Sequence, residues 1–206
     1  MEREVVTGNH FDKYQSSNPI HRLLMRGFLN TAEKFVAKTT FSNVLEVGCG
    51  GAELAHYLFH GRVLREKGLN YFGIDIGSAE IEIAKKRCPT FRFEVASAYE
   101  LPVADRSQDL VVTCEVLEHL EDPVAALQEI SRIARGAVLL SVPCEPLWRV
   151  LNVLRGKYIS KLGNTPGHVQ HFSAKSIHRL ASSFFHVREI AKPLPWTMIL
   201  AETMNR

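Results

Sequence analysis

The feature that most constrains this chain is an apolar run that ends in an acidic residue and a glycine-rich turn, over residues 44–52 (VLEVGCGGA). Glycines stand at positions 48, 50 and 51. Because glycine has no Cβ, the backbone can turn sharply after a strand there and come close to a ligand. The pattern predicts a strand, a tight loop and a helix, which is the repeating unit of α/β folds built on a parallel sheet.

The spacing within this loop bears on the kind of ligand that it accepts. A dinucleotide-binding fingerprint needs a third glycine five residues after the first, and Glu53 stands at that position. A carboxylate there would face a diphosphate, which disfavours an NAD-dependent oxidoreductase. The spacing Glu46-x-Gly48-x-Gly50 instead resembles motif I of the class I S-adenosylmethionine-dependent methyltransferases, the type 11 methyltransferases among them, with Ala52 where a glycine is common.

A second apolar strand is expected over residues 70–76, and it carries a carboxylate, Asp75, near its end. Ser78 can cap the helix that follows. The resemblance implies that Asp75 accepts both ribose hydroxyls of the cofactor, S-adenosyl-L-methionine, and that Ile76 lies against its adenine. The simpler interpretation, an aspartate that only caps a turn, is disfavoured by the position of Asp75 relative to motif I.

A third strand, over residues 91–95, leads to Ser97 and Ala98. Methyltransferases of this class often have an aspartate at the position of Ser97, where it holds the adenine amino group. Serine can still accept one hydrogen bond, and the backbone N–H of Ala98 can reach an adenine ring nitrogen. The alternative, a polar strand end without a ligand, stays open.

A fourth strand, over residues 109–114, runs directly into an acid-acid-histidine cluster of Glu115, Glu118 and His119. In open α/β sheets ligands bind beyond the carboxyl ends of the strands, so chemistry is expected here. By the resemblance, Glu115 belongs to the residues that bind the cofactor. His119 is the candidate general base, because imidazole titrates near neutral pH and can take a proton from a hydroxyl group. A purely structural histidine is the alternative.

The same cluster raises a second possibility, a divalent metal ion. Glu115, Glu118 and His119 are spaced i, i+3 and i+4, so we expect all three on one face of a helical turn. The segment resembles the Glu-x-x-Glu-His metal motif of the quinone-biosynthesis O-methyltransferases and of the RNA 3′-end 2′-O-methyltransferases. His171 or His168 would complete the site, and oxygen-rich ligands would suit Mg²⁺. The alternative is a capping Glu115, a solvated Glu118 and histidines that belong to a loop.

The remaining elements follow from capping signals and periodicity. Asp122 is expected to cap a helix that Gly136 ends, before a fifth strand over residues 137–142. A helix is expected over residues 21–38, and the final strand over residues 196–203.

Length and composition fit a single methyltransferase domain. The 206 residues, with 46% hydrophobic content, suffice for a full core, and alternating strands and helices predict a parallel sheet. The resemblance implies an α/β, Rossmann-like sheet of seven strands, mostly parallel, with helices on both faces and the last strand antiparallel. We expect four parts: an N-terminal lid and helix (1–38), the cofactor-binding core (40–143), an acceptor-site insertion or lid (144–172), and a C-terminal helix and strands (173–206).

The insertion is the most individual part of the chain, and acceptor choice is expected to reside there. Apolar residues alternate with basic ones over residues 148–161, a pattern that suits contact with a membrane surface or with an acidic, lipid-linked acceptor. A lid helix packed over the active site is the alternative. An RNA acceptor would call for stacking aromatic side chains, and Trp148 and Tyr158 are the nearby candidates.

Several other classes are disfavoured by composition. No apolar run reaches the roughly 20 residues of a membrane span, and the first residues lack the order of a signal peptide, so a cytoplasmic enzyme is expected. The four cysteines are widely separated, which argues against a zinc knuckle or a redox pair. A net charge of +3 gives no support to nucleic acid as a partner. The oligomeric state is left open.

The sequence therefore predicts a methyltransferase that acts on a small-molecule or lipid-linked acceptor, at a hydroxyl group, with His119 as base and divalent-metal assistance as a further hypothesis. An N- or C-methyltransferase on the same fold is the main alternative. An RNA 2′-O-methyltransferase, an NAD-dependent oxidoreductase and a non-catalytic cofactor-binding module are less favoured.

Overall fold

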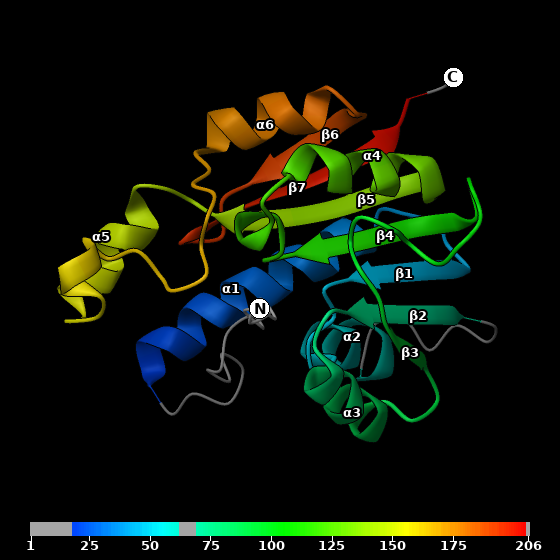
Figure 1. The fold of residues 1–206 in the computed structure, drawn as a ribbon, viewed down its shortest axis with the longest axis horizontal. Coiled ribbons are helices and arrows are strands. Elements are labelled where there is room, and N and C mark those ends of the chain that lie inside the picture. The colour runs from blue at the N-terminus through cyan, green and yellow to red at the C-terminus, as the bar shows by residue number, and fades with distance from the viewer. Residues whose placement is uncertain (1–17, 62–68, 205–206) are drawn as a thin grey trace, which may run out of the picture.

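The structure is a computed structural model, and it describes residues 18–61 and 69–204. A seven-stranded sheet forms its centre, with the strand order β3-β2-β1-β4-β5-β7-β6 (Figure 1). From β3 to β5 in this order, neighbouring strands pair in parallel. Strand β7 runs antiparallel to both of its neighbours, β5 and β6. The strands are β1 (Asn43–Val47), β2 (Asn70–Asp75), β3 (Arg92–Val95), β4 (Gln108–Cys114), β5 (Ala134–Pro143), β6 (Phe185–Ala191) and β7 (Trp196–Thr203). The predicted seven-stranded, Rossmann-like fold is confirmed.

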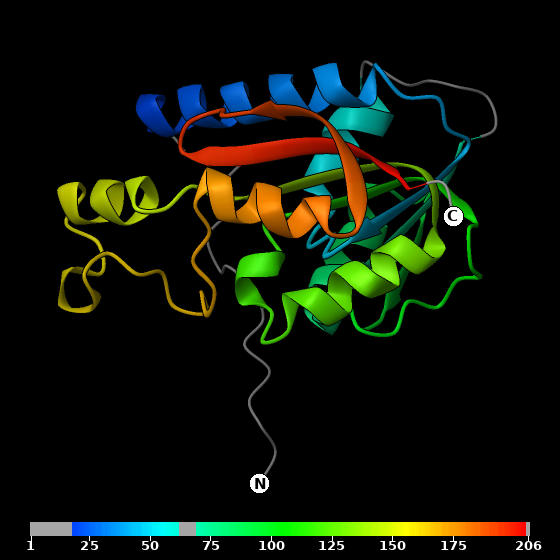
Figure 2. The same ribbon diagram turned by 90° about the horizontal axis from the view of Figure 1, so that it is seen from above.

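Helices cover both faces of this sheet (Figure 2). One face is covered by α1 (Pro19–Val36), α2 (Glu53–Ala55), the π-helical turn η1 (His56–Gly61) and α3 (Ser78–Arg87). The other face is covered by α4 (Pro123–Ile133) and α6 (Ala174–Ser182). The short elements η2 (Leu117–His119), α5 (Leu147–Leu154) and η3 (Ile159–Lys161) lie in the connections that follow β4 and β5.

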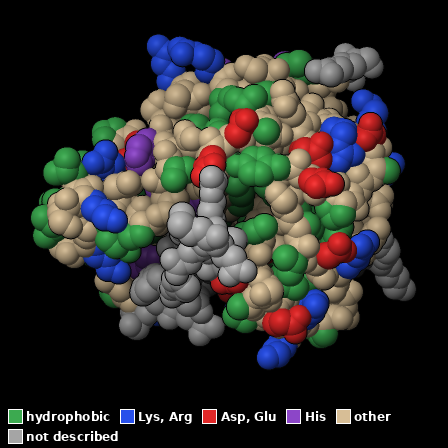
Figure 3. All heavy atoms as spheres, viewed as in Figure 1, with side chains coloured by type: hydrophobic (Ala, Val, Ile, Leu, Met, Phe, Trp, Pro, Cys, Tyr) green, Lys and Arg blue, Asp and Glu red, His purple; other side chains and the backbone are tan. Residues whose placement is uncertain are grey.

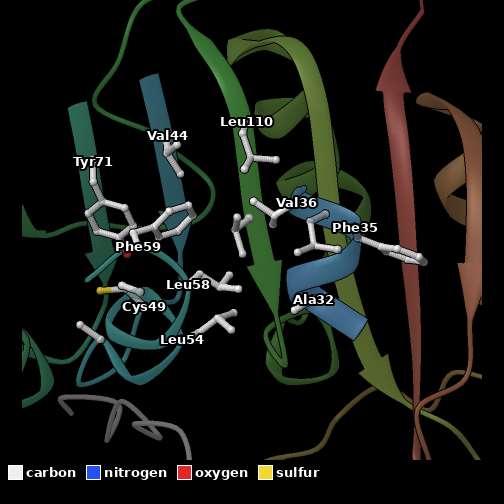
Figure 4. Close-up of a cluster of buried hydrophobic side chains, with 14 of the residues drawn as sticks. Ala32, Phe35, Val36, Val44, Cys49, Leu54, Leu58, Phe59, Tyr71 and Leu110 are labelled. Atoms are coloured by element: carbon white, nitrogen blue, oxygen red, sulfur yellow. The ribbon is translucent and has the colours of Figure 1, made fainter. Parts of the chain in front are cut away.

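The core on each face follows from the alternation of side chains along the strands. Val44 of β1 points into the cluster under α1 and α2, while its neighbour Leu45 points into the cluster under α4. Figure 4 shows the first cluster, which contains Phe35 of α1, Leu58 of η1 and Leu110 of β4. Because both faces are covered, the central strands are apolar on both sides.

Element boundaries differ from the sequence prediction in three places. Helix α1 begins at Pro19, because the Asn18 side chain accepts from the backbone N–H groups of Ile20 and His21. Ser78 is the first residue of α3 and not its cap, which is Gly77. Gly136 lies inside β5, since α4 passes directly into this strand at Ala134. The lid expected before α1 falls almost entirely outside the described residues.

The carboxyl ends of β1 to β5 meet along one edge of the sheet. Because β7 is antiparallel, its first residue, Trp196, pairs with Pro143 at the end of β5 and so comes to the same edge. Within the described ranges, no helix has the length and apolar character needed to cross a membrane.

Candidate functional site

The glycine-rich loop after β1 adopts the conformation that its sequence predicts. Gly48 and Gly50 have positive φ angles of 72° and 49°. A Cβ on Gly48 would come within 2.3 Å of the Val116 side chain, whereas a Cβ on Gly50 would meet nothing closer than 3.9 Å. Ala52 also has a positive φ, 62°, which explains in physical terms why glycine is common at its position.

Asp75, at the end of β2, closes over this loop. Its Oδ2 accepts a hydrogen bond of 2.9 Å from the backbone N–H of Gly50, and its Oδ1 accepts one of 2.9 Å from the N–H of Gly77. Each carboxylate oxygen has a second lone pair, so the group can also accept hydroxyl protons. Half of the Ile76 side chain is exposed next to it, at 50%. An acceptor for ribose hydroxyls, an open loop and an exposed apolar side chain fit the predicted cofactor.

Ser97 and Ala98 lie half-buried after β3, where the resemblance locates the adenine contacts. The Ser97 hydroxyl accepts a hydrogen bond of 3.2 Å from the Tyr99 backbone N–H. Its Oγ–H therefore remains a donor, and its second lone pair remains an acceptor.

Glu46 is buried beneath the loop rather than exposed at its surface. The Tyr71 hydroxyl donates a 2.5 Å hydrogen bond to Glu46 Oε2. Burial raises the pKa of Glu46 from 4.5 to about 8, and the Tyr71 hydrogen bond opposes part of that rise. The contact that the structure gives Glu46 is thus with the neighbouring strand β2.

Glu115 follows β4 in a left-handed conformation, with φ of 62°. Its Oε2 accepts a 2.6 Å hydrogen bond from Trp196 Nε1, at the start of β7. The expectation that Glu115, Glu118 and His119 share one face of a helical turn is wrong, because the left-handed residue precedes the turn and only Leu117–His119 are helical.

Glu118 and His119 instead meet a histidine from the insertion. One ligand atom from each of Glu118, His119 and His168 lies within 4.8 Å of the others. The backbone brings the two segments together, since Glu118 O accepts from the N–H groups of Val169 (2.9 Å) and Gln170 (3.0 Å). Of the four metal ligands predicted from sequence, Glu115 and His171 lie outside this group.

The donor set also differs from the one expected. Two imidazoles and one carboxylate replace the oxygen-rich set that favoured Mg²⁺. Such a set fits borderline ions such as Zn²⁺ or Fe²⁺ better than Mg²⁺, which prefers oxygen ligands.

The orientation of His119 is fixed by the insertion. Its Nδ1 lies 3.0 Å from the Gly167 carbonyl oxygen, which can only accept, so Nδ1 carries a proton. In the neutral ring the lone pair is then on Nε2. The His168 ring meets the His119 ring edge-on, with centroids 4.8 Å apart, and stacks on Trp148 at 6.1 Å.

His171 pairs with a different acid. Its Nδ1 is 3.8 Å from Glu145 Oε1, just after β5. Burial raises the pKa of the Glu145 carboxyl above its usual value, and the neighbouring Arg149 backbone N–H and His171 oppose this rise. His168 therefore lies beside Glu118, and His171 lies beside Glu145, at the same edge of the sheet.

Sequence reasoning named Trp148 only as a candidate for base stacking and residue 196 only as the start of a strand, and it missed the contacts of both tryptophans at this edge. Trp196 holds Glu115, and Trp148 lies between Trp196 and His168, with 5.7 Å between the two indole centroids. The position of Trp196 could have been found, because the first residue of an antiparallel last strand must lie beside the carboxyl end of its neighbour. The contacts of Trp148 are long-range, and no local pattern signals them.

Comparison with known proteins agrees with this geometry. The sequence profile of the family described as "Methyltransferase domain" matches residues 10–184. A ubiquinone biosynthesis O-methyltransferase of Acinetobacter baylyi is 23% identical over 168 residues, which cover 77% of this chain and 68% of the relative.

Two further proteins extend the comparison. A probable S-adenosylmethionine-dependent methyltransferase of Mycobacterium tuberculosis is 32% identical over 113 residues, but the match spans only 38% of its length and 53% of this chain. Among solved structures, magnesium protoporphyrin IX methyltransferase from Synechocystis, with bound SAH, has a TM-score of 0.67 at 18% identity, covering 93% of this chain and 91% of that one. The chain therefore belongs to the methyltransferase-domain family and is a class I S-adenosylmethionine-dependent methyltransferase.

Proposed function

We propose that this enzyme methylates a hydroxyl group of a small-molecule or lipid-linked acceptor, with His119 as the general base. The observation that carries the proposal is the 3.0 Å contact from His119 Nδ1 to the Gly167 carbonyl, which leaves the basic lone pair on Nε2. Bound S-adenosylmethionine supplies a methyl group activated by a positively charged sulfur. The name of the Acinetobacter relative, an O-methyltransferase, also supports a hydroxyl acceptor.

The residues of the site divide into three roles in this proposal. The cofactor is bound by the loop glycines Gly48 and Gly50 and by Asp75, Ile76, Ser97 and Ala98. That site is supported by Glu46, which is buried beneath the loop, and by Glu115, which follows β4. His119 Nε2 receives the hydroxyl proton as the acceptor oxygen gains the methyl group. The insertion, residues 144–172, forms the acceptor side of the site and holds the base through Gly167.

Membership of the methyltransferase family argues against an NAD-dependent oxidoreductase and against a non-catalytic cofactor-binding module. An N- or C-methyltransferase is the remaining alternative, since an amine or carbanion acceptor needs the base less. An RNA acceptor loses support because Trp148, one of its two stacking candidates, is buried at 9% exposure.

A variant of the base tests the proposal. His119→Gln should lower kcat on hydroxyl acceptors such as phenols and sugars by about 10²- to 10⁴-fold, the usual contribution of a general base. Affinity for S-adenosylmethionine should stay unchanged. His178→Gln, at an exposed position of α6, is the matched control and should retain full activity. A His119→Gln enzyme as fast as the wild type would contradict the assignment.

A divalent ion at Glu118, His119 and His168 is a second proposal, and it is supported by the 4.8 Å grouping of their ligand atoms. An ion held there would take up the Nε2 lone pair of His119, so in this second proposal the ion, and not the His119 base, activates the acceptor by lowering the pKa of its hydroxyl. EDTA should then abolish turnover, and restoration should follow the order expected for imidazole ligands, with Zn²⁺ or Fe²⁺ ahead of Mg²⁺. Full activity in EDTA would leave His119 as a base without metal assistance.

A further inference from the structure

The connection between β5 and α6 forms a compact unit that we call the α5 lobe, residues 147–165. It contains α5 and η3 and extends from one end of the molecule (Figures 1 and 2). Trp148 Nε1 donates to Thr165 Oγ1 at 2.9 Å, and Asn152 Nδ2 donates to the Gly163 carbonyl at 2.9 Å. A Cβ on Gly163 would come within 2.2 Å of the Arg149 carbonyl oxygen, so the returning segment packs directly against α5.

The second half of α5 has a burial pattern opposite to that of an ordinary surface helix. Asn152 is buried at 1% exposure, whereas Leu154, two residues further on, is exposed at 76%. A helix of a soluble domain normally buries its aliphatic residues and exposes its amides. The exposed aliphatic and aromatic residues of the lobe are Val150, Val153, Leu154, Tyr158, Ile159 and Leu162.

The charge around this apolar surface has a single sign. Residues 146–188 contain none of the 22 acidic residues of the chain and seven of its 25 lysines and arginines. Arg149, Arg155, Lys157 and Lys161 lie within the lobe itself. In Figure 3 the lobe, at the left of the view, carries green hydrophobic and blue basic side chains on its outer surface.

We infer that the outer face of the α5 lobe docks on an anionic lipid surface. Exposed aliphatic side chains interspersed with basic ones (Figure 3) match the two parts of such a membrane, its acyl chains and its negative headgroups. A nucleic acid would match the charge but not the aliphatic residues, and Tyr158 is the only exposed aromatic side chain of the lobe. An acidic protein would match the charge without needing Leu154 and Leu162 at the surface.

This inference rests on the proposed function in one respect only. The proposed function gives the membrane contact a purpose, which is the delivery of a lipid-linked acceptor. The lobe's return to α6 carries Gly167, which holds the base, and His168, which contacts the base ring. A membrane under the lobe would therefore lie close to the segment that orients His119.

Vesicle co-sedimentation with the full chain tests the inference without cofactor or acceptor. The wild type should bind vesicles of phosphatidylcholine mixed with phosphatidylglycerol, bind pure phosphatidylcholine vesicles far more weakly, and lose binding as salt is raised. Failure to bind the anionic vesicles would overturn the inference. Because no methyl transfer is involved, this failure is distinguishable from failure of the proposed function.

Two matched pairs of variants locate the contact. Val153→Asp in α5 should weaken vesicle binding about tenfold or more, whereas Val124→Asp in α4 should not, although the two valines are exposed to 41% and 42%. Lys161→Glu should weaken binding about fivefold or more, and Lys86→Glu on α3 should leave it unchanged. Thermal unfolding of each variant checks that the fold is retained.

Two results would refute this location. Equal binding by Val153→Asp and Val124→Asp would mean that the lobe does not enter the lipid. The second result has two parts: the wild type is a dimer that Val153→Asp converts to monomers, and neither protein binds vesicles. This result would show that the face joins two copies of the chain.

Discussion

Three carboxyl groups at the ends of β1, β2 and β4 take different roles because their surroundings differ. Asp75 is half-buried and held by two backbone N–H groups. Glu115 has a left-handed backbone, a kind of strain that is concentrated at functional sites, and its side chain accepts a hydrogen bond from Trp196. Glu46 is enclosed and holds its proton to about pH 8, which makes its carboxyl a structural partner of Tyr71 at neutral pH.

Substitution of Asp75 tests the cofactor site at the level of one residue. Asp75→Ala should weaken S-adenosylmethionine binding by about 1.5 to 3 kcal/mol, because hydrogen bonds to a charged group are lost. Calorimetric titration measures this, with exposed Asp105→Ala as the control. Unchanged affinity would remove the assignment of Asp75 to the ribose.

The buried Glu46 predicts a specific pH dependence of stability. Its pKa is higher in the folded chain, about 8, than in the unfolded chain, about 4.5, so the folded state binds the extra proton between these values. The free energy of unfolding should therefore fall as pH rises through this interval, and Glu46→Gln should remove the fall. As pH rises from about 5 to about 8, the free energy of unfolding of the variant should increase relative to that of the wild type by on the order of 3 to 5 kcal/mol. An equal difference in the free energy of unfolding between Glu46→Gln and wild type at both pH values, measured by urea unfolding, would contradict this.

At the scale of elements, the strands and glycine loop were predictable from sequence, while the site around His119 was only partly so. Strand β2 and the loop after β1 depend on local alternation and on glycines, which a short window contains. The turn after β4 depends on Glu115 being left-handed, and the Glu115 side chain is held by Trp196, 81 residues away. The pairing of His168 rather than His171 with the cluster depends on backbone hydrogen bonds from residues 169 and 170 to Glu118, which spacing does not encode.

Asp109 ties neighbouring elements together at the opposite edge of the sheet. Its carboxylate accepts from the backbone N–H groups of Ser42 and Asn43 and from Arg135 Nε at 2.6 Å. These contacts, that with Arg135 first, hold the pKa of Asp109 well below its usual value. Asp109→Asn should lower the free energy of unfolding by about 1.5 to 3 kcal/mol. The difference should be present above about pH 4 and should shrink as pH falls below it, in urea titrations.

Across the molecule, one row of rings links the N-terminal helix to His119. Phe28 of α1 contacts Trp196 at 5.1 Å, Trp196 contacts Trp148, and Trp148 leads through His168 to His119. The row joins the sheet, the covering helix and the α5 lobe, whose outer surface is apolar and basic. Residues from distant parts of the chain therefore pack together beside His119.

Truncation of the central ring tests this connection. Trp148→Ala should cost about 3 to 5 kcal/mol of stability, as expected for a buried tryptophan. It should also lower kcat more than it changes S-adenosylmethionine affinity, because His168 and the base lose their support while the loop after β1 is distant in sequence and on other elements. Loss of cofactor affinity with unchanged kcat would contradict the connection.

The identity of the atom that receives the methyl group tests the proposed hydroxyl chemistry of His119. The enzyme would be given S-adenosylmethionine with an isotopically labelled methyl group and a panel of matched acceptors that differ only in bearing a hydroxyl or an amine, and the products examined by NMR. Label in an O-methyl group, lost in His119→Gln, is the predicted result. Label found only in N-methyl or C-methyl products, at rates unaffected by His119→Gln, would contradict the account.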